Sequence, residues 1–191
     1  MTPRALHRIA ATVALSTLAT VAACRPSAPS SPSESAAQFY TLLDGLGVRG
    51  VPDSLALDAV APYLDSTLLG LLTDARHTRD DFRRRYPSDK PPFVDGDMFS
   101  SLFEGNTSFA IRSTVARGDT TMVVMAFTNS MQPPTVAWTD TLVVVPRANP
   151  APMSPQFVIA DLRYGASWDF ANRGSMVASL RAAISEARAI P

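Results

Sequence analysis

The order of two hydrophobic periodicities constrains the fold of this chain more than any other feature. Between residues 36 and 85, apolar side chains recur every three or four positions, which predicts helices. Between residues 108 and 164 they alternate in short runs separated by turn residues, which predicts strands. Residues 175–190 return to helical spacing. We therefore expect an α+β domain, in which N-terminal helices pack on a curved, antiparallel sheet of about four strands and a C-terminal helix follows.

Capping residues and prolines indicate where the helices begin and end. Ser33 or Ser35 is a candidate N-cap of the first helix, which a group of three glycines would end. Asp53 can cap a short second helix. Pro62 fits the first turn of a third helix or the break before it, and that helix is expected to continue to about Arg85.

The strands are expected at residues 108–117, 120–128, 136–145 and 157–164. The second of them is apolar on both faces, which is typical of a strand in the middle of a sheet. Asp140 falls in the middle of the third strand, and we expect its side chain to face solvent.

The N-terminus has the three parts of a secretory signal peptide. A basic start is followed by an apolar stretch too short for a transmembrane helix, and small residues come last. Val21-Ala22-Ala23-Cys24 resembles the lipobox of bacterial lipoproteins. That resemblance implies cleavage between Ala23 and Cys24, and lipidation of Cys24. We therefore divide the chain into a signal peptide (1–23), the lipidated Cys with a Pro/Ser-rich tether (24–34) and one α+β domain (35–191).

The lipoprotein resemblance also implies a location. Two or three acyl chains hold a protein stably on a membrane, whereas one does not. Arg25 follows the Cys, where an Asp retains lipoproteins in the inner membrane of enterobacteria-like cells. We therefore expect a membrane attachment through the N-terminal lipid in a bacterial cell envelope. The outer membrane, facing the periplasm, is the expected site in an organism that has one.

Charge and residue counts exclude several classes of function. The part after residue 23 has 15 basic and 17 acidic side chains, so its net charge of −2 gives no attraction to nucleic acid. Cys24 is the only cysteine, which excludes an internal disulfide and a cysteine zinc cluster. His77 is the only histidine of that part, and we expect it on a solvated helix face. Neither a catalytic triad, a Gly-rich phosphate loop nor a metal-ligand set is recognisable, so we expect no cofactor and no metal.

Three stretches of the chain resemble a family of bacterial envelope proteins of unknown function. They are Phe39–Leu43, then Phe93–Phe99 running into Phe103–Gly105, and lastly Ile159–Tyr164 followed by Trp168–Phe170. Members of this family look like the nuclear-transport-factor-2-like fold, also called cystatin-like. The resemblance covers about residues 35–185, and it implies a cone-shaped domain without implying a reaction.

The polar residues of these stretches are the candidate site. Asp95 and Asp97 alternate around a glycine, but the calcium-loop template fails after them, so we expect Asp97 to cap a short turn. If the protein is an enzyme, Asp97 and Asp161 are the candidate catalytic residues, because a desolvated carboxyl group can act as a general base. The candidate ligand-binding residues are Tyr40, Asp95, Asp97, Tyr164, Trp168 and Asp169.

Three functions remain open at this stage. The leading hypothesis is a non-catalytic, lipid-anchored binding module for a protein partner in the envelope or for a small ligand. The first alternative is a small enzyme of the isomerase or dehydratase kind that uses a pocket Asp, and an interior filled by Phe and Met side chains would count against it. The second is an inhibitor or immunity-type protein in the periplasm, which an exposed apolar patch with an aromatic centre would favour.

Overall fold

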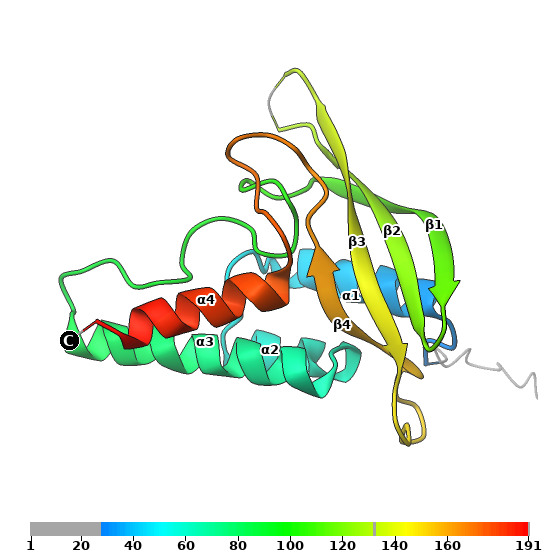
Figure 1. The fold of residues 1–191 in the computed structure, drawn as a ribbon, viewed down its shortest axis with the longest axis horizontal. Coiled ribbons are helices and arrows are strands. Elements are labelled where there is room, and N and C mark those ends of the chain that lie inside the picture. Colours follow the sequence, from blue (N-terminus) through cyan, green and yellow to red (C-terminus); the bar gives the residue numbers. More distant parts are fainter. Residues whose placement is uncertain (1–27, 132, 191) are drawn as a thin grey trace, which may run out of the picture.

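A computed structural model describes residues 28–131 and 133–190, and it has the α+β architecture expected from the sequence (Figure 1). Its elements are α1 (Pro32–Leu46), α2 (Ser54–Val60), a 3₁₀ turn η1 (Ala61–Tyr63), α3 (Ser66–Arg85), β1 (Ser108–Arg117), β2 (Thr120–Asn129), β3 (Val136–Pro146), β4 (Phe157–Arg163) and α4 (Met176–Arg188). The four strands form one antiparallel sheet in the order β1-β2-β3-β4, which confirms the expected central position of β2. The signal peptide, Cys24 and the first part of the tether lie outside the described residues.

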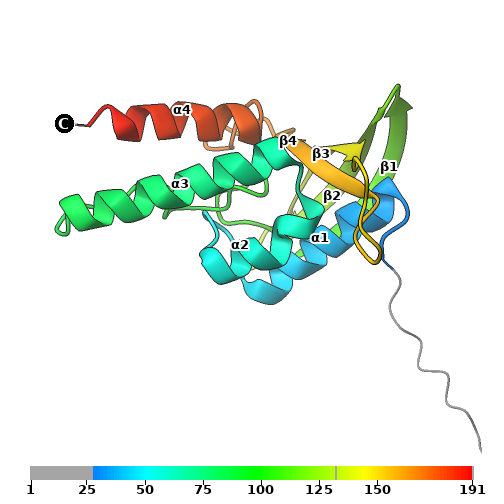
Figure 2. The ribbon, with the colours of Figure 1, turned by 90° about the horizontal axis from the view of Figure 1, so that it is seen from below.

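The helices form a layer on one side of the sheet (Figure 1; Figure 2). α1 contacts all four strands, and α2 packs against α1. α3 and α4 lie side by side and extend away from the sheet, as both views show. No described helix combines the length and the hydropathy that a bilayer crossing requires.

The start of α1 differs from the expectation. Ser31 is the N-cap, and Ser31 and Glu34 form a reciprocal capping box with Pro32 in the first turn. The prediction of Ser33 or Ser35 as the cap is therefore wrong, because Pro32 and Glu34 favour a start two residues or more earlier. The helix also begins three residues before the predicted boundary at residue 35. Gly47 ends it with a φ of 64°, a conformation that favours glycine.

Aromatic side chains fill the space between α1 and the sheet. Phe39 and Tyr40 of α1 and Phe127 of β2 are almost fully buried. The ring centroids of Tyr40 and Phe127 are 5.0 Å apart at 65°, an edge-to-face contact. Met125 of β2 is fully buried in the same core cluster. The interior on which the enzyme hypothesis depends is thus packed with the side chains that the sequence analysis named as unfavourable to it.

Loops gather at the two ends of the sheet. We call one of them the loop end, where residues 93–107, 130–131, 133–135 and 164–174 meet near the start of β3, in the upper part of Figure 1. The opposite end carries the β1–β2 turn and the β3–β4 loop. There the carbonyl of Pro29 accepts a hydrogen bond of 3.1 Å from the amide of Gln156, so the first described residues lie at this opposite end.

Candidate binding site at the loop end

Asp140 of β3 is buried, so the prediction that its side chain faces solvent is wrong. It lies on the inner side of β3 together with Trp138 and Leu142. Its Oδ2 accepts hydrogen bonds from the amide of Ser101 (2.7 Å) and from Nε1 of Trp138 (3.1 Å). Its Oδ1 accepts from the amide of Gly165 (2.8 Å) and from the Ser101 hydroxyl. Asp140 therefore connects β3 to two of the three loops of this end.

Asp97 is the second buried carboxyl group. Its Oδ1 accepts a hydrogen bond of 2.6 Å from the amide of Phe99, which confirms the expected turn cap. Its Oδ2 lies 3.6 Å from Nη1 of Arg49 and accepts no hydrogen bond from the described residues. Burial raises the pKa of Asp97 to about 7, although the Phe99 amide and the Arg49 charge act in the lowering direction.

Two tyrosines and an asparagine hold the segment 97–101. The hydroxyl groups of Tyr40 and Tyr164 each donate a hydrogen bond of 2.8 Å to a backbone carbonyl of this segment. Nδ2 of Asn172 donates two more, of 2.8 and 2.7 Å. Burial raises the pKa of both tyrosine hydroxyls well above the ordinary value. The two phenols thus anchor a loop, and Tyr164 also lines a small hollow of about 160 Å³ together with Asp95.

The other predicted carboxylates do not join this group. Asp95 is exposed and forms an ion pair with Lys90. Asp161 accepts hydrogen bonds from the amides of Leu162 (2.9 Å) and Val177 (3.0 Å), so it supports the start of α4. Asp169 is exposed. Of the predicted polar set, the structure brings Tyr40, Asp97 and Tyr164 to one segment, and it adds Asp140, Arg49 and Asn172, which the sequence analysis did not select.

A groove opens at the surface of the loop end. We call the part of it that mainly apolar side chains line the apolar half, and this half has a volume of about 460 Å³. Residues from all three loops and the adjoining strands line it: Leu102, Glu104, Asn129, Met131, Pro133, Pro134, Val136 and Phe170. Met131 and Phe170 are 79% and 66% exposed, high values for large apolar side chains. Exposed apolar surface of this kind is typical of a contact with another molecule.

An aromatic stack supports the rim of this half. The ring of Phe170 stacks on Trp168, with 6.0 Å between centroids and 6° between planes. Trp168 in turn meets Trp138 edge to face at 5.8 Å. Trp138 is buried in β3, so the exposed Phe170 is connected through a half-buried ring to the core. Trp168 belongs to the predicted set, and its position at this rim is consistent with a binding role.

A second hollow adjoins the apolar half, and we call it the polar half of the groove. It has a volume of about 480 Å³ and shares Glu104, Asn129 and Met131 with the apolar half. The remaining lining residues are Asp44, Arg49, Asn106 and Thr107. The two halves together offer a mostly apolar surface next to charged and amide groups.

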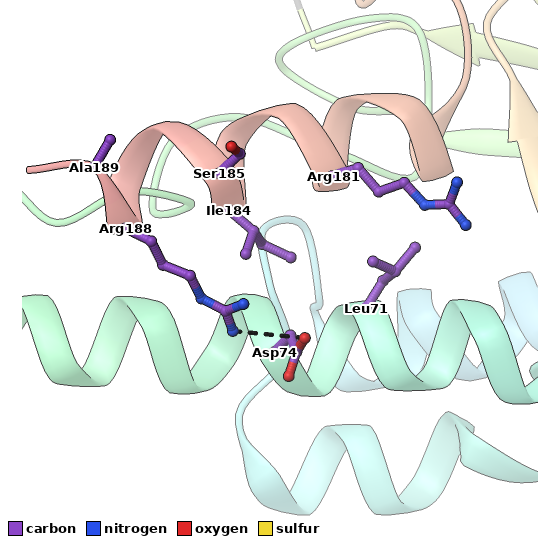
Figure 3. A pocket seen from close by; sticks show the side chains of 7 residues that line it. All are labelled: Leu71, Asp74, Arg181, Ile184, Ser185, Arg188 and Ala189. Carbon is purple, nitrogen blue, oxygen red and sulfur yellow. Dashed lines mark ion pairs between the residues drawn. The ribbon is translucent and has the colours of Figure 1, made fainter.

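Another hollow lies between α3 and α4, with a volume of about 500 Å³ (Figure 3). Figure 3 shows Leu71 of α3 and Ile184 of α4 in the space between the two helices, with Arg188 paired to Asp74 at 3.5 Å. Its lining comes from two packed helices and includes no residue of the predicted set. We therefore assign this hollow to helix packing, and the loop end is the candidate site.

Comparisons with known protein families, with curated proteins and with solved structures gave no match for this chain. Within residues 28–131 and 133–190, no three histidine, cysteine or acidic side chains come together as a possible metal site. The family resemblance and the functions considered above therefore remain predictions, and the geometry of the loop end is the basis for choosing among them.

Proposed function

We propose that the protein is a lipid-anchored cell-envelope protein whose domain binds a protein partner at the loop end without catalysing a reaction. The observation that carries this proposal is the exposed groove around Met131 and Phe170. Small-ligand binding, the other part of our leading hypothesis, has less support, because the groove is open to solvent and the interior of the domain is filled.

The position of the groove fits an anchored protein. Residue Pro29 contacts the opposite end of the sheet, and Cys24 precedes it by only five positions. β3 separates the two ends with eleven residues, or roughly 36 Å at ~3.3 Å per residue. A lipid on Cys24 would therefore hold the opposite end near the bilayer and present the loop end to the periplasm, where a partner can reach it.

We also propose that the domain has the nuclear-transport-factor-2-like form. The support is a helix, α1, that crosses the inner face of a four-stranded antiparallel sheet, together with the resemblance of Phe39–Leu43 and Phe93–Phe99 to that family. In this form the cone between helix and sheet would hold the buried Asp97 and Asp140. Because backbone amides bind both carboxylates, we assign them a role in positioning the loops.

An inhibitor or immunity-type function is the second candidate. An exposed apolar patch with an aromatic centre was the feature that would favour it, and Phe170 stacked on Trp168 provides such a centre. The two candidates place the partner on the same surface and differ in what the partner does.

Site-specific photo-crosslinking in intact cells tests the proposal. A photoreactive phenylalanine analogue at Met131 or Phe170 is expected to give a discrete crosslinked protein. The matched controls are Met153 at the opposite end and Leu55 of α2, which are 70% and 77% exposed. Equal crosslinking at all four positions, or none at Met131 and Phe170, would contradict the proposed surface. If the crosslinked protein is an enzyme that the purified domain inhibits, the inhibitor candidate is favoured.

The anchor has its own test. We expect Cys24→Ser to move the protein from the membrane fraction to the soluble fraction and to abolish acylation seen by mass spectrometry. A Cys24→Ser variant that stays in the membrane fraction would refute the lipid anchor while leaving the groove untouched.

A further inference from the structure

We infer that the partner presents a peptide segment in which a large apolar side chain lies next to a lysine or arginine. This inference rests on the proposed function, because it specifies the chemistry of the segment that occupies the groove. The apolar half of the groove indicates the large apolar side chain, and the polar half indicates the lysine or arginine.

The apolar half selects the apolar side chain. Leu102 and Val136 contribute aliphatic surface, and Pro133 and Pro134 form one wall. Phe170 forms the exposed rim, braced by Trp168. A large side chain inserted here would remove apolar surface of both molecules from water, which is the main driving force of association.

The polar half selects a cation. Its only basic residue is Arg49, whose guanidinium is already engaged by Asp44 at 3.2 Å and by Asp97 at 3.6 Å. Nη2 of Arg49 also donates to the carbonyl of Asn106 at 3.2 Å. Glu104, which lines both halves, is exposed and has no ion-pair partner among the described residues. The charge balance of the polar half is therefore negative, and it is complementary to a lysine or arginine.

A buried amide indicates that the occupant is a peptide. Nδ2 of Asn106 has no hydrogen-bond acceptor among the described residues, and the side chain is only 4% exposed. An unpaired buried donor costs free energy, and Nδ2 has almost no accessible surface, so it can donate to an occupant's carbonyl oxygen only after the Asn106 side chain turns toward the polar half. A peptide backbone offers that oxygen beside its side chains, whereas a simple amine does not.

Selection from a random-peptide display library against the full-length lipidated protein in nanodiscs tests the inference. We expect the wild-type protein to enrich peptides that pair a large apolar residue with a nearby Lys or Arg. Glu104→Lys is expected to lose this cation preference or to favour acidic peptides. The matched control is Asp119→Lys, which makes the same charge change in the exposed β1–β2 turn at the opposite end.

Affinity measurements with one enriched synthetic peptide give the quantitative result. We expect binding to Glu104→Lys to be at least about fivefold weaker than to the wild type, the scale of a partly exposed charge pair. Asp119→Lys should stay within about twofold of the wild type, because screening removes the effect of a distant exposed charge. Circular dichroism checks that both variants fold, and Glu104→Gln replaces the lysine variant if it does not.

Three results would overturn the inference: no enriched peptide, enrichment without a cation, or equal loss of binding in the two lysine variants. None of them depends on the crosslinking result. If Met131 and Phe170 crosslink to a partner while the library shows no cation preference, the proposed function holds and this inference fails. If the crosslinks are absent as well, the surface itself is wrong.

Discussion

The raised pKa of Asp97 predicts that the unfolding free energy of the domain depends on pH, and a single substitution should remove this dependence. Burial raises the pKa of Asp97 to about 7 in the folded protein, compared with an ordinary value of 3.8. The folded state therefore binds this proton more tightly than the unfolded state does. The resulting stabilisation is complete below about pH 4 and is lost as the pH rises through 7. At about 1.4 kcal/mol per pKa unit, the loss is roughly 4 kcal/mol, with a slope of about 1.4 kcal/mol per pH unit near pH 5 to 6.

Urea unfolding followed by tryptophan fluorescence at a series of pH values measures this slope. Asp97→Asn cannot ionise, and its amide oxygen can still accept from the Phe99 amide. We expect the variant to lack the decline in unfolding free energy between pH 5 and pH 7 that the wild type shows. Asp95→Asn is the control, because Asp95 is exposed only two positions away and its substitution should leave the decline intact. A decline of equal slope in Asp97→Asn and the wild type would refute the assignment to Asp97.

Two further predictions concern stability. Asp140→Ala should lower the unfolding free energy by about 3 kcal/mol or more, because it leaves the buried amide of Ser101 and Nε1 of Trp138 without an acceptor. Urea unfolding would show a much smaller loss if Asp140 did not connect the loops to β3. Between α3 and α4, Ile184→Ala should cost about 2–4 kcal/mol while Arg188→Ala costs less than about 1 kcal/mol, because Ile184 is buried and the Arg188–Asp74 pair is more than half exposed; thermal unfolding that ranks the two variants in the reverse order would contradict this (Figure 3).

The helices and strands were predictable wherever the local signal was strong. Asp53 caps α2 as expected, and the predicted strands agree with the observed ones to within one residue at each end. The start of α1 was missed because the capping box of Ser31 and Glu34 lies in a Pro/Ser-rich stretch, whose composition is typical of a tether. The Pro/Ser-rich composition of this stretch predicts an irregular tether, whereas the capping box predicts the start of a helix. The structure follows the capping box.

The candidate site was predictable in part. Asp97 was expected to cap a turn, and its hydrogen bond to Phe99 confirms that. Asp140 was missed although the signal was present, since it alternates in phase with Trp138 and Leu142 on β3. A charged residue at an inward position contradicts the usual pattern of strands, so the prediction followed the residue type and ignored the periodicity.

The groove could not be predicted from local sequence, because residues about 30 to 40 positions apart form it. Phe170 lies in one of the two loops that Asp140 connects to β3 through the amides of Ser101 and Gly165, whereas Met131 lies in the loop that precedes β3. Buried carboxylates are costly unless they are hydrogen-bonded, and here backbone amides of the loops supply the donors. The same hydrogen bonds that compensate the burial of Asp140 therefore hold two of the three loops in place against β3. In our proposal, the buried carboxylates Asp97 and Asp140 position an exposed apolar surface. Evolutionary selection for binding would act on these residues because they determine the shape of that surface.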